Sequence, residues 1–275
     1  EQEAKTEELY KKVRGVLNKL TPQKFTTLVS QVQSLPIDNS ERLQGVINLV
    51  FEKAVDEPSF SVAYAGMCKI LSGMQVPGEQ QENVNFRKLL VNRCQLEFEK
   101  SPDLELNKEA KMREIEECTD PDKRKELQLL MEDEERRMRM KSVGNVRFIG
   151  ELFKLGMLTT NIMIRCIKQL LSTGYEESLE CLCKLLTTIG KDLENKNQDL
   201  SPYFDKMREV SLKRGEVSSR VRFMLQDVID LRQNKWIPRR DDSNPKTMDQ
   251  IQKDAEKEVL ETQMILNSVP QTPPR

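Results

Sequence analysis

The segment ESLECLCKLLTTIGKDLE, at residues 177–194, combines two cysteines, a glycine, a lysine and several carboxylates. These residue types occur together in metal, redox and nucleotide-binding sites. On a helix, however, Cys181 and Cys183 project roughly 160° apart, which prevents one metal ion from taking both thiolates. A phosphate-binding loop would need a glycine at Leu185 and a serine or threonine at Asp192. The segment therefore predicts a buried helix in which each cysteine acts as a small hydrophobe.

The inventory of reactive residues also argues against catalysis. The chain has no histidine and six cysteines, so the usual imidazole base, the cysteine–histidine nucleophile pair and histidine-containing zinc sites are excluded. The cysteines lack Cys-x-x-Cys spacing, which predicts free thiols in a reducing compartment. We expect no catalytic residue, no metal site and no cofactor.

The composition is that of a soluble globular chain. It has 275 residues, of which 32% are charged, and a formal net charge of -1. Any electrostatic specialisation must therefore be local. The N-terminal residues lack the apolar core of a signal peptide, and no apolar run is long enough to cross a bilayer. We expect a cytoplasmic protein with no membrane partner.

Helical periodicity organises most of the chain into pairs of apolar stripes. The paired segments are 9–20 with 25–32, 43–51 with 60–71, 84–98 with 143–156, 159–171 with 177–190, and 202–212 with 217–232. No strand is expected, and the sequence VPGEQQEN predicts a loop after the second pair. Successive uninterrupted pairs begin roughly forty residues apart, as in HEAT repeats. The sequence predicts an all-α, HEAT-like helical-repeat solenoid of about five antiparallel helix pairs.

Two segments do not follow this regular spacing of helix pairs. Residues 100–141 form a charged insertion in the third pair, for which we expect a mobile loop followed by a long solvated helix; an acidic binding segment is the alternative. We assign residues 1–235 to the repeat domain. Residues 236–275 form a basic, then acidic tail, partly helical, whose Pro-rich end SVPQTPPR is typical of a linker.

The first helix pair carries a candidate contact surface. Thr21 precedes a proline and is expected to cap the second helix, while Leu20 and Phe25 have the spacing of a hydrophobic staple that fixes the angle between the helices. Lys24 stands where a capping box would place Glu or Gln. Because an end repeat has one face without a neighbour, its apolar residues are also candidate anchors for a partner.

The last repeat carries a candidate RNA-binding surface. Residues 206–240 contain ten Lys or Arg and four Asp or Glu, and Trp236 stands where a base could stack. Lys235, Arg239 and Arg240 would contact phosphates. The alternative is that this charge is a solvated helix face, with Trp236 pinning the tail. Arg220 and Arg222 flank an expected core stripe of Val221, Phe223, Leu225 and Val228.

Several collinear blocks resemble the middle (MIF4G, HEAT-like) domain of the eukaryotic translation initiation factor 4 gamma family. They are ELYKKVRGVLNKLTPQKF, VNFRKLLVNRCQLEFEK, GNVRFIGELFKLGML, EESLECLCKLLTTIGKDLE and SSRVRFMLQDVIDLR with KWIPRR. The resemblance implies a scaffold without catalysis of its own. It would bind a DEAD-box RNA helicase, orient the two helicase lobes and stimulate ATP-dependent unwinding.

The resemblance also assigns contact residues. It implies that Leu17, Leu20 and Phe25 contact the C-terminal lobe of the helicase, and that Arg220 and Arg222 lie beside the other lobe. It further implies binding of mRNA, of structured RNA entry elements and of the large ribosome-associated initiation factor. None of the four tyrosines is followed five positions on by leucine, so the peptide that tethers the cap-binding protein is expected outside this chain. The alternative is a MIF4G-type translational repressor, or another scaffold of mRNA metabolism, that uses the same helicase-binding surface.

Overall fold

The computed structural model of this chain describes residues 2–77, 83–99, 101–213 and 215–238. Its helices are α1 (Gln2–Leu17), α2 (Phe25–Gln33), α3 (Ser40–Asp56), α4 (Ser61–Leu71), α5 (Phe86–Glu99), α6 (Ser101–Glu117), α7 (Pro121–Lys154), α8 (Thr160–Thr173), α9 (Glu176–Asn195), α10 (Ser201–Leu212) and α11 (Ser219–Gln233). Short 3-10 turns, η1 (Pro22–Lys24) and η2 (Pro58–Phe60), precede α2 and α4. The all-α prediction is confirmed.

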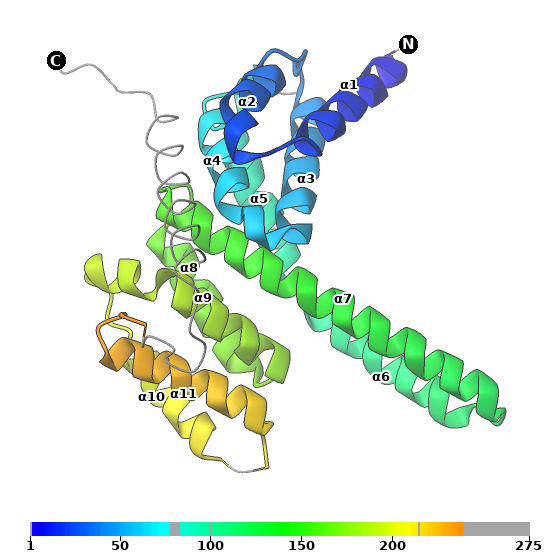
Figure 1. Ribbon diagram of the computed structural model, residues 1–275, viewed down its shortest axis with the longest axis vertical. Coiled ribbons are helices and arrows are strands. Elements are labelled where there is room, and N and C mark those ends of the chain that lie inside the picture. The colour runs from blue at the N-terminus through cyan, green and yellow to red at the C-terminus, as the bar shows by residue number, and fades with distance from the viewer. Residues whose placement is uncertain (1, 78–82, 100, 214, 239–275) are drawn as a thin grey trace, which may run out of the picture.

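The helices stack as successive pairs, as the periodicity predicted (Figure 1). The pairs are α1 with α2, α3 with α4, α5 with the second half of α7, α8 with α9, and α10 with α11. Neighbouring pairs pack through α1 on α3, α3 and α4 on α7, α7 on α9, and α9 on α11. One continuous set of buried apolar side chains runs through all of them. The HEAT-like solenoid is therefore stabilised mainly by contacts between adjacent repeats.

Side-chain caps fix where several helices begin. The side chains of Asn39, Thr159 and Ser218 each accept a hydrogen bond from a backbone N–H in the first turn of α3, α8 and α11. Asp120 does the same for α7. These caps satisfy amide groups that the helix itself leaves without acceptors. At the other end of α8, Gly174 adopts φ +70°, a conformation that suits glycine and ends the helix.

A buried arginine attaches the first helix to the second pair. Arg42 on α3 is 4% exposed, and its guanidinium lies 2.9 Å from the carboxylate of Asp38. It also donates to the Thr6 hydroxyl and to the side-chain oxygen of Gln2, both at 3.1 Å. Because a buried guanidinium must have its donors satisfied, these bonds fix α1 in one position along α3.

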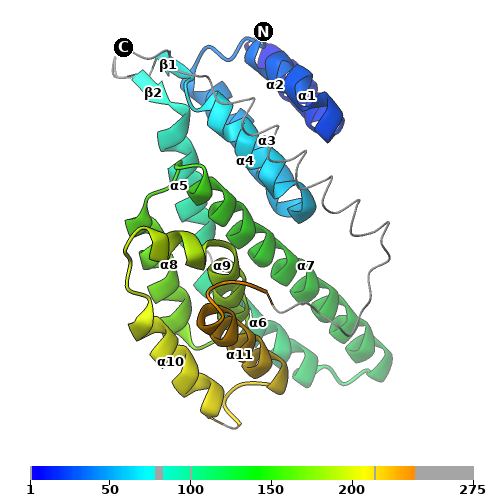
Figure 2. The same cartoon turned by 60° about the vertical axis from the view of Figure 1, so that its left-hand side comes forward.

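The charged insertion differs from the expected loop followed by a helix. It forms a hairpin of two helices, α6 and the first half of α7, which extends beyond the stacked pairs in both views (Figures 1 and 2). Lys108 pairs with Glu135 at 3.2 Å, and Lys111 pairs with Glu134. Arg124 donates to backbone carbonyls at the end of α6. Helix-forming residues with few buried apolar side chains, such as Ile115 at 8% exposure, make up α6, so periodicity missed this first helix.

A short hairpin of strands occupies part of the segment predicted to be a loop, and the expectation of no strand was wrong there. Strands β1 (Gln75–Pro77) and β2 (Asn83–Asn85) pair antiparallel, with Val76 opposite Val84. Val76 is 3% exposed. The pairing lets an otherwise irregular segment cover the core between α4 and α5 while its backbone groups bond to one another. Three residues are too few to give a strand pattern in the sequence.

The segment that resembled a reactive site is the buried helix α9, as predicted. Leu179, Leu182, Leu186 and Ile189 are 0% exposed, and Cys183 is 2% exposed. The helix passes through Gly190 and continues to Asn195. No helix in the described part of the chain has an apolar stretch long enough to span a membrane.

Candidate functional site: the two end surfaces of the solenoid

The apolar residues expected to anchor the helicase lie inside the protein. Leu17, Leu20 and Phe25 are 2%, 7% and 3% exposed. The tip of the Phe25 ring lies 3.4 Å from the position that a Cβ on Gly66 of α4 would take. The exposed end-repeat anchors predicted from the sequence are therefore not observed. These three side chains join α1 and α2 to the second pair and fix the shape of the surface above them.

The entry into α2 also differs from the prediction. Thr21 does not cap α2; its carbonyl accepts the Lys24 N–H and closes the turn η1, and the residue before α2 is Lys24, which makes no side-chain cap bond. The turn leaves the side chains of Lys19 and Lys24 exposed. Within the described residues neither ammonium group has a partner. The accessible chemistry beside Leu20 and Phe25 is thus polar and basic.

At the other end of the stack, Arg220 is held by a carboxylate of the preceding pair. Its Nη2 lies 3.1 Å from Oε2 of Glu180 on α9. Glu180 is 8% exposed, whereas the Arg220 side chain is 51% exposed. Hydrogen bonding and charge from Glu180 raise the pKa of Arg220. Arg220 therefore presents a permanent positive charge in a fixed position.

One residue of the predicted core stripe on α11, Phe223, departs from the prediction. Phe223 was expected in the core, but it is 65% exposed. Val221, Leu225, Val228 and Ile229 form the buried face of α11; position 223 is two residues from Val221 and points the opposite way. Arg222 is half-buried, and its Nε is buried without a hydrogen-bond partner. The exposed aromatic ring is a candidate contact that periodicity should have revealed.

The tryptophan after α11 is packed against the domain. Trp236 donates from Nε1 to Glu194 Oε2 at 2.6 Å, and its ring makes an edge contact with Phe204 at 6.0 Å between centroids. Arg232 donates to the other oxygen of Glu194 at 2.7 Å and lies over the Phe204 ring. A Cβ on Gly190 would come within 2.1 Å of the indole. Only a glycine leaves room for the ring on α9.

This packing favours the second of the two roles considered for Trp236. The indole N–H and the ring edge are already engaged, so the alternative of a pinned tail describes the structure better. Lys235 is exposed and has φ +54°, and Trp236 has φ +61°. Both residues adopt the left-handed region, which places the indole back onto α9. Arg239 and Arg240, the other predicted RNA contacts, lie outside the described residues.

Five of the six cysteines lie in the core, as their positions in apolar segments predicted. Cys68, Cys94, Cys166, Cys181 and Cys183 are buried. Burial raises the pKa of Cys94, Cys181 and Cys183 to about 12 and that of Cys166 to about 11. A thiol with such a pKa carries almost no thiolate near neutrality. Among the described residues no group of three or more His, Cys, Asp or Glu side chains is placed to hold a metal ion.

The stacked pairs and their two end surfaces define a helical-repeat protein. The sequence matches the MIF4G domain over residues 10–235, and the chain belongs to the MIF4G domain family. It is 52% identical over 259 residues to mouse eukaryotic translation initiation factor 4 gamma 1, covering 93% of this chain and 16% of that protein. It is 53% identical over 263 residues to human eukaryotic translation initiation factor 4 gamma 3, covering 94% of this chain and 16% of that protein.

The matched region is one part of much larger relatives, because the chain spans 16% of the length of each of these two proteins. Among solved structures, the MIF4G domain of Trypanosoma cruzi translation initiation factor EIF4G5 aligns with a TM-score of 0.49 at 20% identity, covering 83% of this chain and 97% of that chain.

Proposed function

We propose that this chain is a translation initiation scaffold that binds a DEAD-box RNA helicase and stimulates its ATP-dependent unwinding. The observation that carries the proposal is the match to the MIF4G domain over residues 10–235, together with more than 50% identity to initiation factors 4 gamma. The chain itself would contribute no catalytic group. It would act in the cytoplasm, where translation takes place.

The solenoid suits this role because its two end surfaces are far apart on one continuous core. The α1–α2 pair and the α10–α11 pair lie at opposite ends of the stack (Figure 1). A helicase with two flexibly joined lobes loses conformational entropy when it closes on RNA and ATP. A scaffold that contacts one lobe at each end would hold them near the closed arrangement and favour that state.

At the N-terminal end, the proposed contact is made by the polar surface around Lys19 and Lys24. Leu17, Leu20 and Phe25 would then act indirectly by fixing that surface. At the C-terminal end, the proposed contact combines the exposed ring of Phe223 with Arg220 and the accessible part of Arg222. Aromatic and arginine side chains are enriched at the energetically important positions of interfaces.

RNA and a ribosome-associated factor complete the proposed set of partners. Lys235 and the basic residues of α10 and α11 would contact phosphates of mRNA or of structured entry elements, without stacking on Trp236. Such binding should tolerate sequence changes and fall steeply with salt. The large ribosome-associated initiation factor is proposed on the family relationship alone.

A MIF4G-type translational repressor, or another scaffold of mRNA metabolism, remains the second candidate because it would use the same helicase-binding surface. A translation assay separates the two. Tethered to a reporter mRNA, a chain that promotes initiation raises reporter output, whereas a repressor lowers it.

The helicase proposal is tested by association and by RNA-dependent ATP turnover. Charge reversal of Lys19 and Lys24 should weaken helicase binding about tenfold or more, since charged interface contacts control both orientation and affinity. Phe223→Ala should have a similar effect at the other end. The matched control is charge reversal of Lys123 and Lys125 at the exposed tip of α7. Equal binding by all of these variants would contradict the assignment of the end surfaces.

A further inference from the structure

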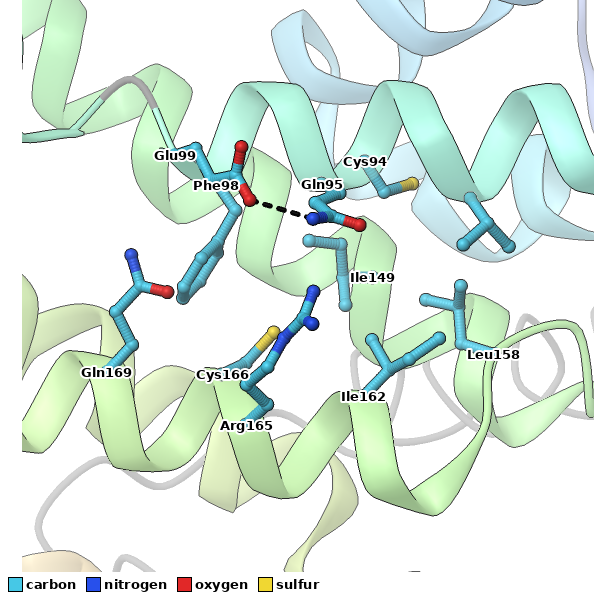
Figure 3. A pocket seen from close by; sticks show the side chains of 11 residues that line it. Cys94, Gln95, Phe98, Glu99, Ile149, Leu158, Ile162, Arg165, Cys166 and Gln169 are labelled. Atoms are coloured by element: carbon cyan, nitrogen blue, oxygen red, sulfur yellow. Dashed lines mark hydrogen bonds between the residues drawn. The ribbon is translucent and has the colours of Figure 1, made fainter.

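A slot between two repeats offers a binding site away from both end surfaces. It lies between α5 and α8, with α7 at its back, and its hollow measures about 440 Å³ including the open mouth. Its apolar lining consists of Val91, Phe98, Ile149, Leu158 and Ile162. We call this hollow the α5–α8 slot. Figure 3 shows side chains from all three helices pointing into it.

The floor of the α5–α8 slot is apolar, and its thiols are neutral. Cys94 and Cys166 contribute to the lining, and burial raises their thiol pKa to about 12 and about 11. Both sulfurs are therefore neutral and act as polarizable apolar surface. A floor of aliphatic side chains and neutral thiols favours an apolar group of the size of a leucine or phenylalanine side chain.

The mouth of the slot is polar on both rims, with Gln95 and Glu99 on α5 and Arg165 and Gln169 on α8. On α5, Gln95 donates to Glu99 at 2.8 Å, so that carboxylate is already hydrogen-bonded. Arg165 points from α8 toward α5 at the mouth (Figure 3). It is exposed, and within the described residues its guanidinium has no hydrogen-bond or ion-pair partner. Gln169, one turn further along α8, adds a side-chain amide.

The charge of α8 determines what can approach this mouth. The helix sequence TNIMIRCIKQLLST contains Arg165 and Lys168 and no acidic residue. Lys168 is also exposed and lies on the same side of the helix, three residues after Arg165. An anionic group placed at the α8 rim would meet Arg165, which can form a bidentate contact with a carboxylate, with Lys168 one turn further along; Glu99 on the α5 rim directs such a group toward α8.

We propose that the α5–α8 slot docks an acidic amphipathic helix of a partner protein. One leucine or phenylalanine of that helix fills the slot, and an aspartate or glutamate about one turn away pairs with Arg165. The apolar depth of the slot favours this occupant over a nucleic acid, whose phosphates would reach the arginine but leave the floor unfilled. The proposal does not depend on helicase binding, since it uses helices at the middle of the stack.

The proposal predicts binding of a designed probe. A short synthetic helix with leucines at i and i+4 and glutamates at i+3 and i+7 should perturb the methyl resonances of Ile149 and Ile162 in the full chain. The methyls of Ile47, which is 0% exposed in the second pair, serve as the internal reference and should not move. The same peptide with glutamine in place of each glutamate should bind about tenfold more weakly.

Charge exchange provides the decisive variant. Arg165→Glu should weaken binding of the glutamate peptide about tenfold and strengthen binding of a matched lysine peptide. It should leave the urea midpoint unchanged because the side chain is exposed. Lys184→Glu, an equivalent charge reversal on the exposed face of α9, should leave both peptides unaffected.

Three results would overturn the proposal. The first is the absence of Ile149 and Ile162 shifts at millimolar peptide. The second is equal binding of the glutamate and glutamine peptides. The third is an oligouridine probe whose binding falls with Arg165→Glu while peptide binding does not, which would assign the α8 charge to nucleic acid instead.

Discussion

The substitution Gly190→Ala directly tests how the domain ends. The added methyl group would lie 2.1 Å from the indole of Trp236, a separation that no relaxed contact allows. Because α9 packs on α7, α8 and α11, we expect the indole rather than the helix backbone to move out of this position. The hydrogen bond from Trp236 to Glu194 and the edge contact with Phe204 would then be lost.

The magnitude follows from opposing effects. Truncating a buried tryptophan costs about 3–5 kcal/mol, and the half-buried position of Trp236 places the loss nearer 2–3 kcal/mol. Alanine in place of glycine inside a helix returns about 1 kcal/mol. We therefore expect Gly190→Ala to lower the free energy of unfolding by about 1–2 kcal/mol. Trp236→Ala should lower it by about 2–3 kcal/mol.

The double variant gives the sharper result. Once the indole is gone, the alanine methyl has space, so adding Gly190→Ala to Trp236→Ala should stabilise the protein by about 1 kcal/mol. The effect of Gly190→Ala on the free energy of unfolding thus changes sign between the two backgrounds, which corresponds to a coupling energy of about 2–3 kcal/mol.

Urea unfolding followed by circular dichroism measures all three variants. The chain has one tryptophan, so its fluorescence reports this contact alone and should shift to the red in Gly190→Ala. Unchanged emission and stability in that variant, or simple additivity in the double variant, would refute the packing argument.

Four further outcomes follow from burial and backbone geometry. Replacing Leu17, Leu20 and Phe25 together with alanine should unfold the first helix pair while the later pairs stay folded, because each truncation costs about 2–5 kcal/mol. Hydrogen exchange would show which helices lose protection, and α1 and α2 amides that stay protected would contradict the prediction. Lys235→Gly should raise stability by about 0.5–1 kcal/mol by relieving the left-handed conformation, as thermal melts can show. Denatured protein should titrate six thiols and carry no stoichiometric zinc, whereas Ellman's reagent should react with the native protein first at the partly exposed Cys118. Above pH 9 the urea midpoint should fall, because the thiols ionise in the unfolded chain but stay protonated in the folded protein. Each buried thiol should lower the free energy of unfolding by about 1.4 kcal/mol per pH unit. A midpoint that stays constant to pH 10 would contradict this.

The fold was largely predictable because its information is local. In α9, apolar residues recur at helical spacing, and the same pattern marks both members of each pair. The first helix of the charged hairpin, α6, escaped this reasoning because it lacks a wide apolar stripe, whereas the long helix that follows it was expected. Helical spacing also predicts that Phe223 is exposed, because a residue two positions after Val221 on α11 points away from the buried face.

The surfaces were less predictable because they depend on contacts distant in sequence. The role of Trp236 depends on Glu194 and Gly190, which lie more than forty positions earlier. Phe25 is buried because α4 lies against it, and a single repeat considered alone leaves that face open. Arg165 is a candidate contact residue only because α5 and α7 form a slot beside it, which the sequence of α8 alone does not reveal.

The central claim is that this chain binds and stimulates a DEAD-box helicase, and one measurement tests it most directly. The purified chain is mixed with an initiation-type DEAD-box helicase, and complex formation and RNA-dependent ATP turnover are followed in the same samples. The account predicts a stable complex, faster turnover than the helicase alone, and loss of both effects on charge reversal of Lys19 and Lys24. Absence of a complex, or a complex in which turnover stays at the level of the free helicase, would contradict it.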